Sequence, residues 1–253
     1  MSTRTLNDSE VYNAEDSWPN DSWPIPQELR RQLLAVLLDR DEQPLREMSY
    51  EEFLEWADED TLAEWVDGKV IMTSPASNRH QQLVSFLDQL AGLYVRYRSV
   101  GELRIAPFQM RLTNSGREPD LLFIRTEHLD RLRSTYLDGP ADLVVEIISP
   151  ESIGRDRGDK FFEYEEAGIP EFWLLDPQTQ RAEFYQLNSA GRYQPIQTLD
   201  GVYRSAVISG FWLREEWLWQ EPLPLPFKLL AEIAGLEASL VEQFEQALRN
   251  KFV

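Results

Sequence analysis

The pattern of apolar and polar positions along the chain predicts a mixed α/β domain. Apolar residues recur every three or four positions from Ser77 to Arg98, which indicates a long amphipathic helix. A second helix is predicted over 156–167, from a cap at Asp156 to a stop at Gly168. Short apolar runs predict strands at about 102–112, 120–124, 142–148, 171–176, 181–187 and 192–197. We therefore expect a mixed β-sheet flanked by helices.

Composition divides the chain into three parts. Residues 1–44 form an acidic leader with a short helix and a repeated Asp-Ser-Trp-Pro, which is typical either of a partly disordered segment or of a docking peptide. Residues 45–220 are expected to form the α/β domain, with a hairpin turn at Asp67-Gly68. Residues 221–253 begin as a proline-rich linker and continue as an amphipathic helix, whose apolar side either packs on the domain or forms a dimer contact.

The residue types present limit the chemistry. The chain has no cysteine and only two histidines, His80 and His128, so thiol catalysis and thiolate metal sites are excluded. A metal would be held mainly by oxygen, which favours Mg²⁺ or Mn²⁺. No run approaches the roughly 20 apolar residues of a membrane span, and the N-terminus lacks the plan of a signal peptide. These features predict a cytoplasmic protein without a membrane partner.

The net charge of −19 opposes binding to nucleic acid. The charge is uneven, because residues 1–60 carry 16 acids against 5 bases, whereas the remaining 193 residues carry 28 acids and 20 bases. Arginines are frequent between positions 96 and 157. A local basic surface is therefore compatible with the acidic chain.

Three polar residues stand in otherwise apolar surroundings. Asp120 precedes the run Leu-Leu-Phe-Ile, and Glu146 interrupts a run of aliphatic residues, so each predicted strand carries one carboxylate. A buried carboxylate must be paired, hydrogen-bonded or metal-bound. Lys160 follows on the next predicted helix and shares a face with Tyr164. The carboxylates of Asp120 and Glu146, with the carbonyl oxygen of Ile147, suit a divalent ion that activates water for phosphodiester hydrolysis, while Lys160 stabilises the developing charge.

Simpler interpretations of the same residues remain open. Asp120 follows a proline and is also suited to capping a turn. Glu146 and Lys160 are equally compatible with a structural ion pair. Tyr164 either packs in the core or positions Lys160.

Several motifs are shared with a known family: Pro119-Asp120, Val145-Glu146-Ile147-Ile148-Ser149-Pro150, Asp156-Arg157, Asp159-Lys160, Tyr164, Ala167-Gly168-Ile169-Pro170-Glu171-Phe172-Trp173 and Asp176-Pro177. Over about residues 45–220 the chain resembles the Uma-two family of endonucleases, in the PD-(D/E)xK superfamily. The resemblance implies a restriction-endonuclease-like fold and Mg²⁺-dependent cleavage of DNA. Position 148, where the superfamily motif has lysine, is Ile148, so the resemblance implies that Lys160 is a migrated substitute.

Two further candidate residues come from this resemblance. Glu64 is either a further metal ligand or a surface charge of the hairpin. His80, at the head of the long helix, is either a general base or phosphate contact, or a solvated helix cap.

Two other functions compete with a homodimeric DNA endonuclease. The first is a catalytically silent, nuclease-derived module that binds or assembles through the leader and the tail helix. The second is a hydrolase of small phosphorylated molecules, which would need a narrow closed pocket.

Overall fold

The computed structural model describes residues 47–57, 61–72, 76–149 and 158–250, without the side chain of residue 250. A boundary between Gln43 and Pro44 divides the chain into two units, and all of the described residues belong to the second. The predictions for the acidic leader, its Trp-Pro repeat and the cap at Asp156 therefore lie outside the described residues.

A six-stranded mixed sheet forms the centre of this unit, in the order β11-β10-β9-β8-β6-β3. Strands β8 and β9 run parallel, and the other neighbours are antiparallel. The strands span β3 (Gly101–Ile105), β6 (Leu121–Arg125), β8 (Leu143–Ile147), β9 (Glu171–Asp176), β10 (Arg181–Leu187) and β11 (Tyr193–Pro195). The predicted mixed sheet and the strands at 171–176 and 181–187 are confirmed.

A second, five-stranded sheet has the order β2-β1-β5-β4-β7. Its strands are β1 (Ala63–Val66), β2 (Lys69–Met72), β4 (Gln109–Arg111), β5 (Ser115–Arg117) and β7 (Tyr136–Asp138). Asp67 and Gly68 join β1 to β2 with φ values of 47° and 84°. Two successive positive φ values are what a tight hairpin turn needs, so the predicted turn is confirmed.

The prediction of one strand over 102–112 is wrong. The segment forms β3 and β4, which belong to different sheets. Pro107 lies between them and has no N–H to donate to a β-ladder, so the pairing ends there. The chain thereby passes from the central sheet to the second sheet.

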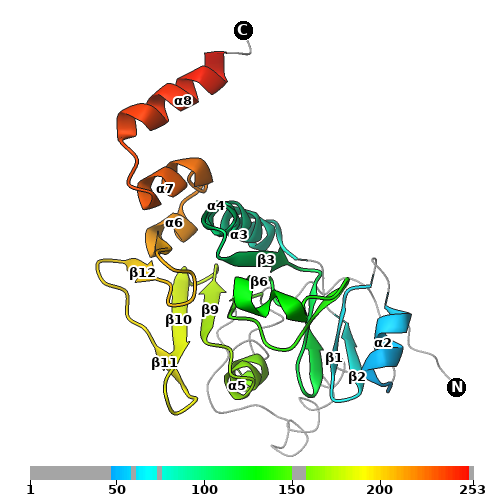
Figure 1. Cartoon of the computed structure of the whole chain (residues 1–253). Coiled ribbons are helices and arrows are strands. Elements are labelled where there is room, and N and C mark those ends of the chain that lie inside the picture. Colours follow the sequence, from blue (N-terminus) through cyan, green and yellow to red (C-terminus); the bar gives the residue numbers. More distant parts are fainter. Residues whose placement is uncertain (1–46, 58–60, 73–75, 150–157, 251–253) are drawn as a thin grey trace, which may run out of the picture. The chain divides into compact units, whose positions relative to one another are not determined.

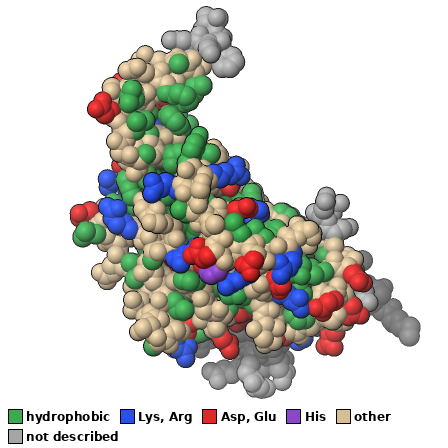
Figure 2. Space-filling model, in the orientation of Figure 1, with side chains coloured by type: hydrophobic (Ala, Val, Ile, Leu, Met, Phe, Trp, Pro, Cys, Tyr) green, Lys and Arg blue, Asp and Glu red, His purple; other side chains and the backbone are tan. Residues whose placement is uncertain are grey.

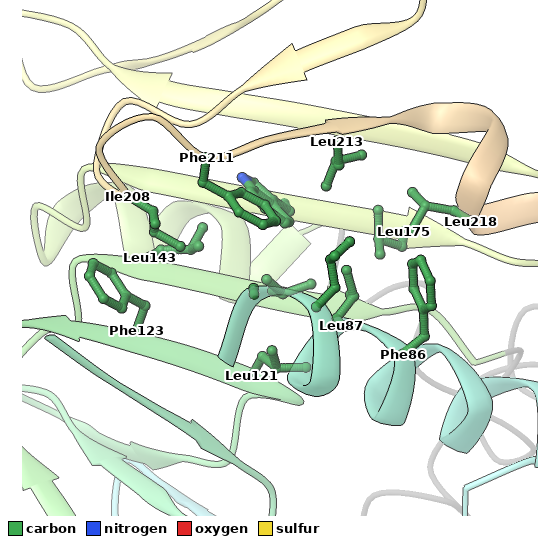
Figure 3. Close-up of a cluster of buried hydrophobic side chains, with 14 of the residues drawn as sticks. Phe86, Leu87, Leu121, Phe123, Leu143, Leu175, Ile208, Phe211, Leu213 and Leu218 are labelled. Carbon is green, nitrogen blue, oxygen red and sulfur yellow. The ribbon is translucent and has the colours of Figure 1, made fainter. Parts of the chain in front are cut away.

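The long helix predicted from Ser77 to Arg98 is confirmed, although its middle is π-helical. It comprises α3 (Asn78–Leu87), η1 (Asp88–Gly92) and α4 (Leu93–Arg98), and the Ser77 side chain accepts a hydrogen bond from the backbone N–H of His80 at its start. Figure 3 shows Phe86 and Leu87 of α3 beside Leu121 and Leu175 of the central sheet. The same cluster is completed by the β12 (Val202–Arg204) and β13 (Trp212–Arg214) hairpin and by α6 (Glu215–Trp219).

The opposite face of the central sheet packs against α5 (Lys160–Glu166) (Figure 1). Side chains alternate between the two faces along a strand, so Leu121 faces α3 whereas Leu122 belongs to the cluster around Tyr164. Met110 and other residues of the second sheet complete this cluster. Helices η2 (Thr126–Arg131) and α2 (Tyr50–Trp56) lie at the margins of the two sheets.

The prediction of a single C-terminal helix is wrong, because the segment forms two helices. Gly235, with φ of 69°, separates α7 (Pro226–Ile233) from α8 (Ala238–Asn250). Leu229 of α7 is buried in the core, and Phe227 contacts Phe244 of α8 with ring centroids 4.5 Å apart. Hydrophobic side chains remain exposed along these helices (Figure 2). Neither these nor any other described helix has the length and apolar character of a membrane span.

Candidate active site

The two carboxylates predicted to converge lie on neighbouring strands. Glu146 is in β8, and Asp120 directly precedes β6. Leu121 pairs with Val145 in the antiparallel ladder of these strands, so Asp120 and Glu146 are the next pair in register. Side chains at directly opposed positions emerge on the same face of a sheet.

Lys160 and Tyr164 both contact Glu146. The Lys160 Nζ lies 3.1 Å from each carboxylate oxygen, and the Tyr164 hydroxyl donates a hydrogen bond of 2.7 Å to Oε1. The two donors are one helical turn apart on α5 and therefore face the sheet together. All three side chains are buried. The structure thus brings together three residues that the sequence singles out.

Glu64 of β1 joins this cluster from the second sheet. Its Oε1 lies 3.2 Å from Lys160 Nζ and accepts a 3.1 Å hydrogen bond from the backbone N–H of Glu118. The Glu64 residue is only 2% exposed, so its interpretation as a surface charge of the hairpin is wrong. Lys160 therefore lies between carboxylates from two different sheets.

Arg117 and Glu163 extend the cluster, and neither is identified by the sequence reasoning. Arg117 of β5 donates a 3.2 Å hydrogen bond to Glu64 and a 2.8 Å hydrogen bond to Glu163 of α5. The hydroxyl of Ser115 also donates to Glu163. The spacing of Glu163 three residues after Lys160 is a weak sequence signal, whereas Arg117 is one arginine among many.

Burial and charge shift the pKa values of this cluster in different directions. Burial acts to raise the pKa of Glu64, but Lys160 and Arg117 together hold it below its ordinary value. Burial, with the nearby Glu146 charge, raises the pKa of Tyr164 well above its ordinary value, so its hydroxyl remains a donor. Burial also raises the pKa of Glu118 to about 7.

His80 lies beside Asp120 rather than at a solvated helix end. Its Nε2 is 3.0 Å from Asp120 Oδ2, and the same oxygen accepts a 2.7 Å hydrogen bond from the backbone N–H of Ile147. The His80 residue is 9% exposed, so the interpretation as a solvated cap is wrong. The side chain of Asp120 is 15% exposed and is thus the more accessible of the two strand carboxylates.

The oxygen donors fit a hard divalent cation. Among the described residues, no group of three or more His, Asp or Glu side chains is gathered as a metal site. Mg²⁺, however, is usually held by one or two carboxylates, with waters and substrate phosphates completing its shell. Asp120 and Glu146 provide two such carboxylates at opposed positions of neighbouring strands. Ligation by the carbonyl of Ile147 stays a prediction.

The visible surface is mixed in charge. On the face that Figure 2 shows, acidic and basic side chains lie interspersed in small groups. This face therefore differs from the continuous basic surface typical of proteins that bind nucleic acid.

Comparison with solved structures defines the class of fold. The chain matches a crystal structure described as "a putative nuclease belonging to DUF820" from Anabaena variabilis, with a TM-score of 0.59 and 16% sequence identity. The match covers 68% of this chain and 97% of that one, so the α/β domain shares the fold of that protein.

The family follows from the sequence itself. The Uma2 model, described as "Putative restriction endonuclease", matches residues 50–226, and the chain belongs to this family. No curated protein matches the chain. The resemblance to the Uma-two family is thereby confirmed.

Proposed function

We propose that this protein is a metal-dependent endonuclease that hydrolyses DNA phosphodiester bonds with Mg²⁺ or Mn²⁺. The observation that carries the proposal is the placement of Asp120 opposite Glu146 in the register of the neighbouring strands β6 and β8, with Lys160 in contact with Glu146. Family membership supports a nuclease. The donor chemistry supports a hard divalent cation.

Asp120 and Glu146 would hold the cation, which when bound polarises the phosphate and lowers the pKa of water. The ammonium of Lys160 offsets negative charge that develops on the phosphate oxygens. Tyr164 is a positioning residue, because its hydroxyl orients the carboxylate of Glu146. His80 orients Asp120 in the same way, because its Nε2 contacts Asp120 Oδ2. The same oxygen accepts a hydrogen bond from the backbone N–H of Ile147.

Two observations favour a catalytically silent binding module as a second candidate. Both oxygens of Glu146 lie within 3.1 Å of Lys160, which is the arrangement of a structural ion pair. The net charge of −19 also disfavours contact with phosphate backbones. In this alternative, substitution of Lys160 lowers stability and nothing else.

A nuclease assay with single- and double-stranded DNA separates these functions. Wild type should cut at least one substrate in Mg²⁺ or Mn²⁺ and should be inactive in EDTA. Asp120→Ala should be inactive in all conditions while remaining folded. Absence of cleavage by wild type with either metal would favour the binding module. The homodimer and the cytoplasmic location expected from the sequence stay predictions.

A further inference from the structure

We propose that Glu64 is a positioning residue that receives Lys160 when Glu146 binds a divalent cation. The inference rests on the proposed function, because it assumes that Asp120 and Glu146 form the metal site. It assigns Glu64 the task of holding an ammonium, in place of the direct metal ligation that its family position suggested.

The geometry places Lys160 between two carboxylates. Its Nζ is 3.1 Å from Glu146 Oε1 and 3.2 Å from Glu64 Oε1. The side chains are 8%, 4% and 3% exposed for Lys160, Glu146 and Glu64, so water screens their charges weakly. Movement of the ammonium from one carboxylate toward the other requires no passage through solvent.

Lys160 and a divalent cation compete for Glu146. Two positive ions close together in a buried site repel each other, and the ammonium already contacts both oxygens of this carboxylate. A buried ammonium that lost its partner would be strongly destabilised. Glu64 removes that cost, because it offers a second carboxylate to the same Nζ.

Glu64 is fixed by other donors of the chain. Arg117 binds its Oε2 at 3.2 Å, and the backbone N–H of Glu118 binds its Oε1 at 3.1 Å. Arg117 is itself held by Glu163 of α5, the helix that carries Lys160. This set of contacts keeps Glu64 aimed at Lys160 and leaves it poorly suited to ligate a metal.

The test is a double-mutant cycle in Mn²⁺ affinity, measured by calorimetric titration without DNA. Glu64→Gln should weaken Mn²⁺ binding by about tenfold or more, the usual size of coupling between sites, because Lys160 then keeps Glu146. Lys160→Met should tighten binding. When Glu64→Gln is added to Lys160→Met, the Mn²⁺ affinity should differ from that of Lys160→Met alone by less than about threefold, because the competing ammonium is gone.

Asp138→Asn is the control, because Asp138 forms an exposed pair with Arg133, and it should leave the Mn²⁺ affinity unchanged. Should Glu64→Gln fail to fold, Glu64→Asp keeps the charge but shortens the reach, and its loss of affinity should likewise disappear with Lys160→Met. An equal loss with and without Lys160→Met would overturn the inference, as would no loss in either background. Equal Mn²⁺ binding by wild type and Asp120→Ala would instead remove the metal site, and with it the proposed function.

Discussion

Lys160 Nζ contacts both carboxylate oxygens of Glu146 at 3.1 Å and thereby fastens α5 to a central strand of the six-stranded sheet. The two residues are 14 positions apart in the sequence. Both side chains are buried, and a buried charge is not stable without a partner. Their contact is both a structural link and the core of the proposed active site.

Mn²⁺ should raise the melting temperature of wild type more than that of Asp120→Ala or Glu146→Ala. A ligand that binds only the folded state stabilises it, and each variant removes one carboxylate of the site. Differential scanning fluorimetry with increasing Mn²⁺ measures the shift. Asp138→Asn is the control, because Asp138 forms an exposed pair with Arg133 and should keep the wild-type response. Equal shifts in all four proteins would place the metal elsewhere.

Arg117→Met should lower the free energy of unfolding by about 3–5 kcal/mol, the size typical of removing one partner from a buried ion pair. Arg117 is 3% exposed and holds both Glu64 and Glu163, whose charges lose a common partner. Urea denaturation measures the change. Arg133→Met removes a half-exposed arginine and should cost no more than about 1 kcal/mol. Similar costs for the two variants would contradict the buried network.

Lys160→Met should reduce the cleavage rate by roughly 10²-fold or more, as expected on removal of one preorganised charge-stabilising donor. Lys160→Arg should restore little activity, because a planar guanidinium replaces a compact ammonium poorly. Single-turnover kinetics on DNA measures both, with Lys228→Met as an exposed-lysine control. A Lys160→Met protein that is less stable but cleaves normally per folded molecule would make the contact purely structural.

Glu171 should make the fold less stable as the pH rises. It is fully buried and accepts hydrogen bonds from Trp173, Ser205, Ala206 and Val207, yet burial raises its pKa above the ordinary value. The folded state therefore binds the proton more tightly than the unfolded state. Its contribution to stability is greatest below the unfolded pKa of about 4.3 and is lost as the pH rises through the folded pKa.

The free energy of unfolding of wild type and Glu171→Gln, measured in urea across this pH range, isolates that contribution. The difference between the proteins should vary with pH, because only wild type carries the titrating group. Parallel pH profiles would show that Glu171 has the same pKa in both states.

The sequence identifies Glu146 and Lys160 for a physical reason. A carboxylate within a run of aliphatic residues, followed by an isolated lysine, is costly to bury unless the two charges meet. The hairpin at Asp67-Gly68 and the helix end at Gly168 are also predictable from the local sequence, because both depend on positive φ at a glycine. Such features can be predicted from the local sequence, without knowledge of tertiary contacts.

Other features depend on contacts that no local pattern encodes. Arg117 becomes part of the site only because the second sheet places β5 beside β1 and opposite α5. The apolar periodicity from Leu229 to Leu248 continues through Gly235, so it conceals the break between α7 and α8. Likewise, the strands on either side of Pro107 share one apolar pattern but belong to different sheets.

The most direct test of a metal-dependent nuclease is the cleavage rate of DNA as a function of Mg²⁺ or Mn²⁺ concentration, measured for wild type, Glu146→Gln and Asp138→Asn. Glu146→Gln removes the charge of a proposed ligand, whereas Asp138→Asn removes the charge of an exposed carboxylate that pairs with Arg133. Wild type and Asp138→Asn should show a rate that rises with metal and saturates, and Glu146→Gln should show none. Equal metal-dependent cleavage by wild type and Glu146→Gln, or no cleavage by wild type at any metal concentration, would contradict the proposed function.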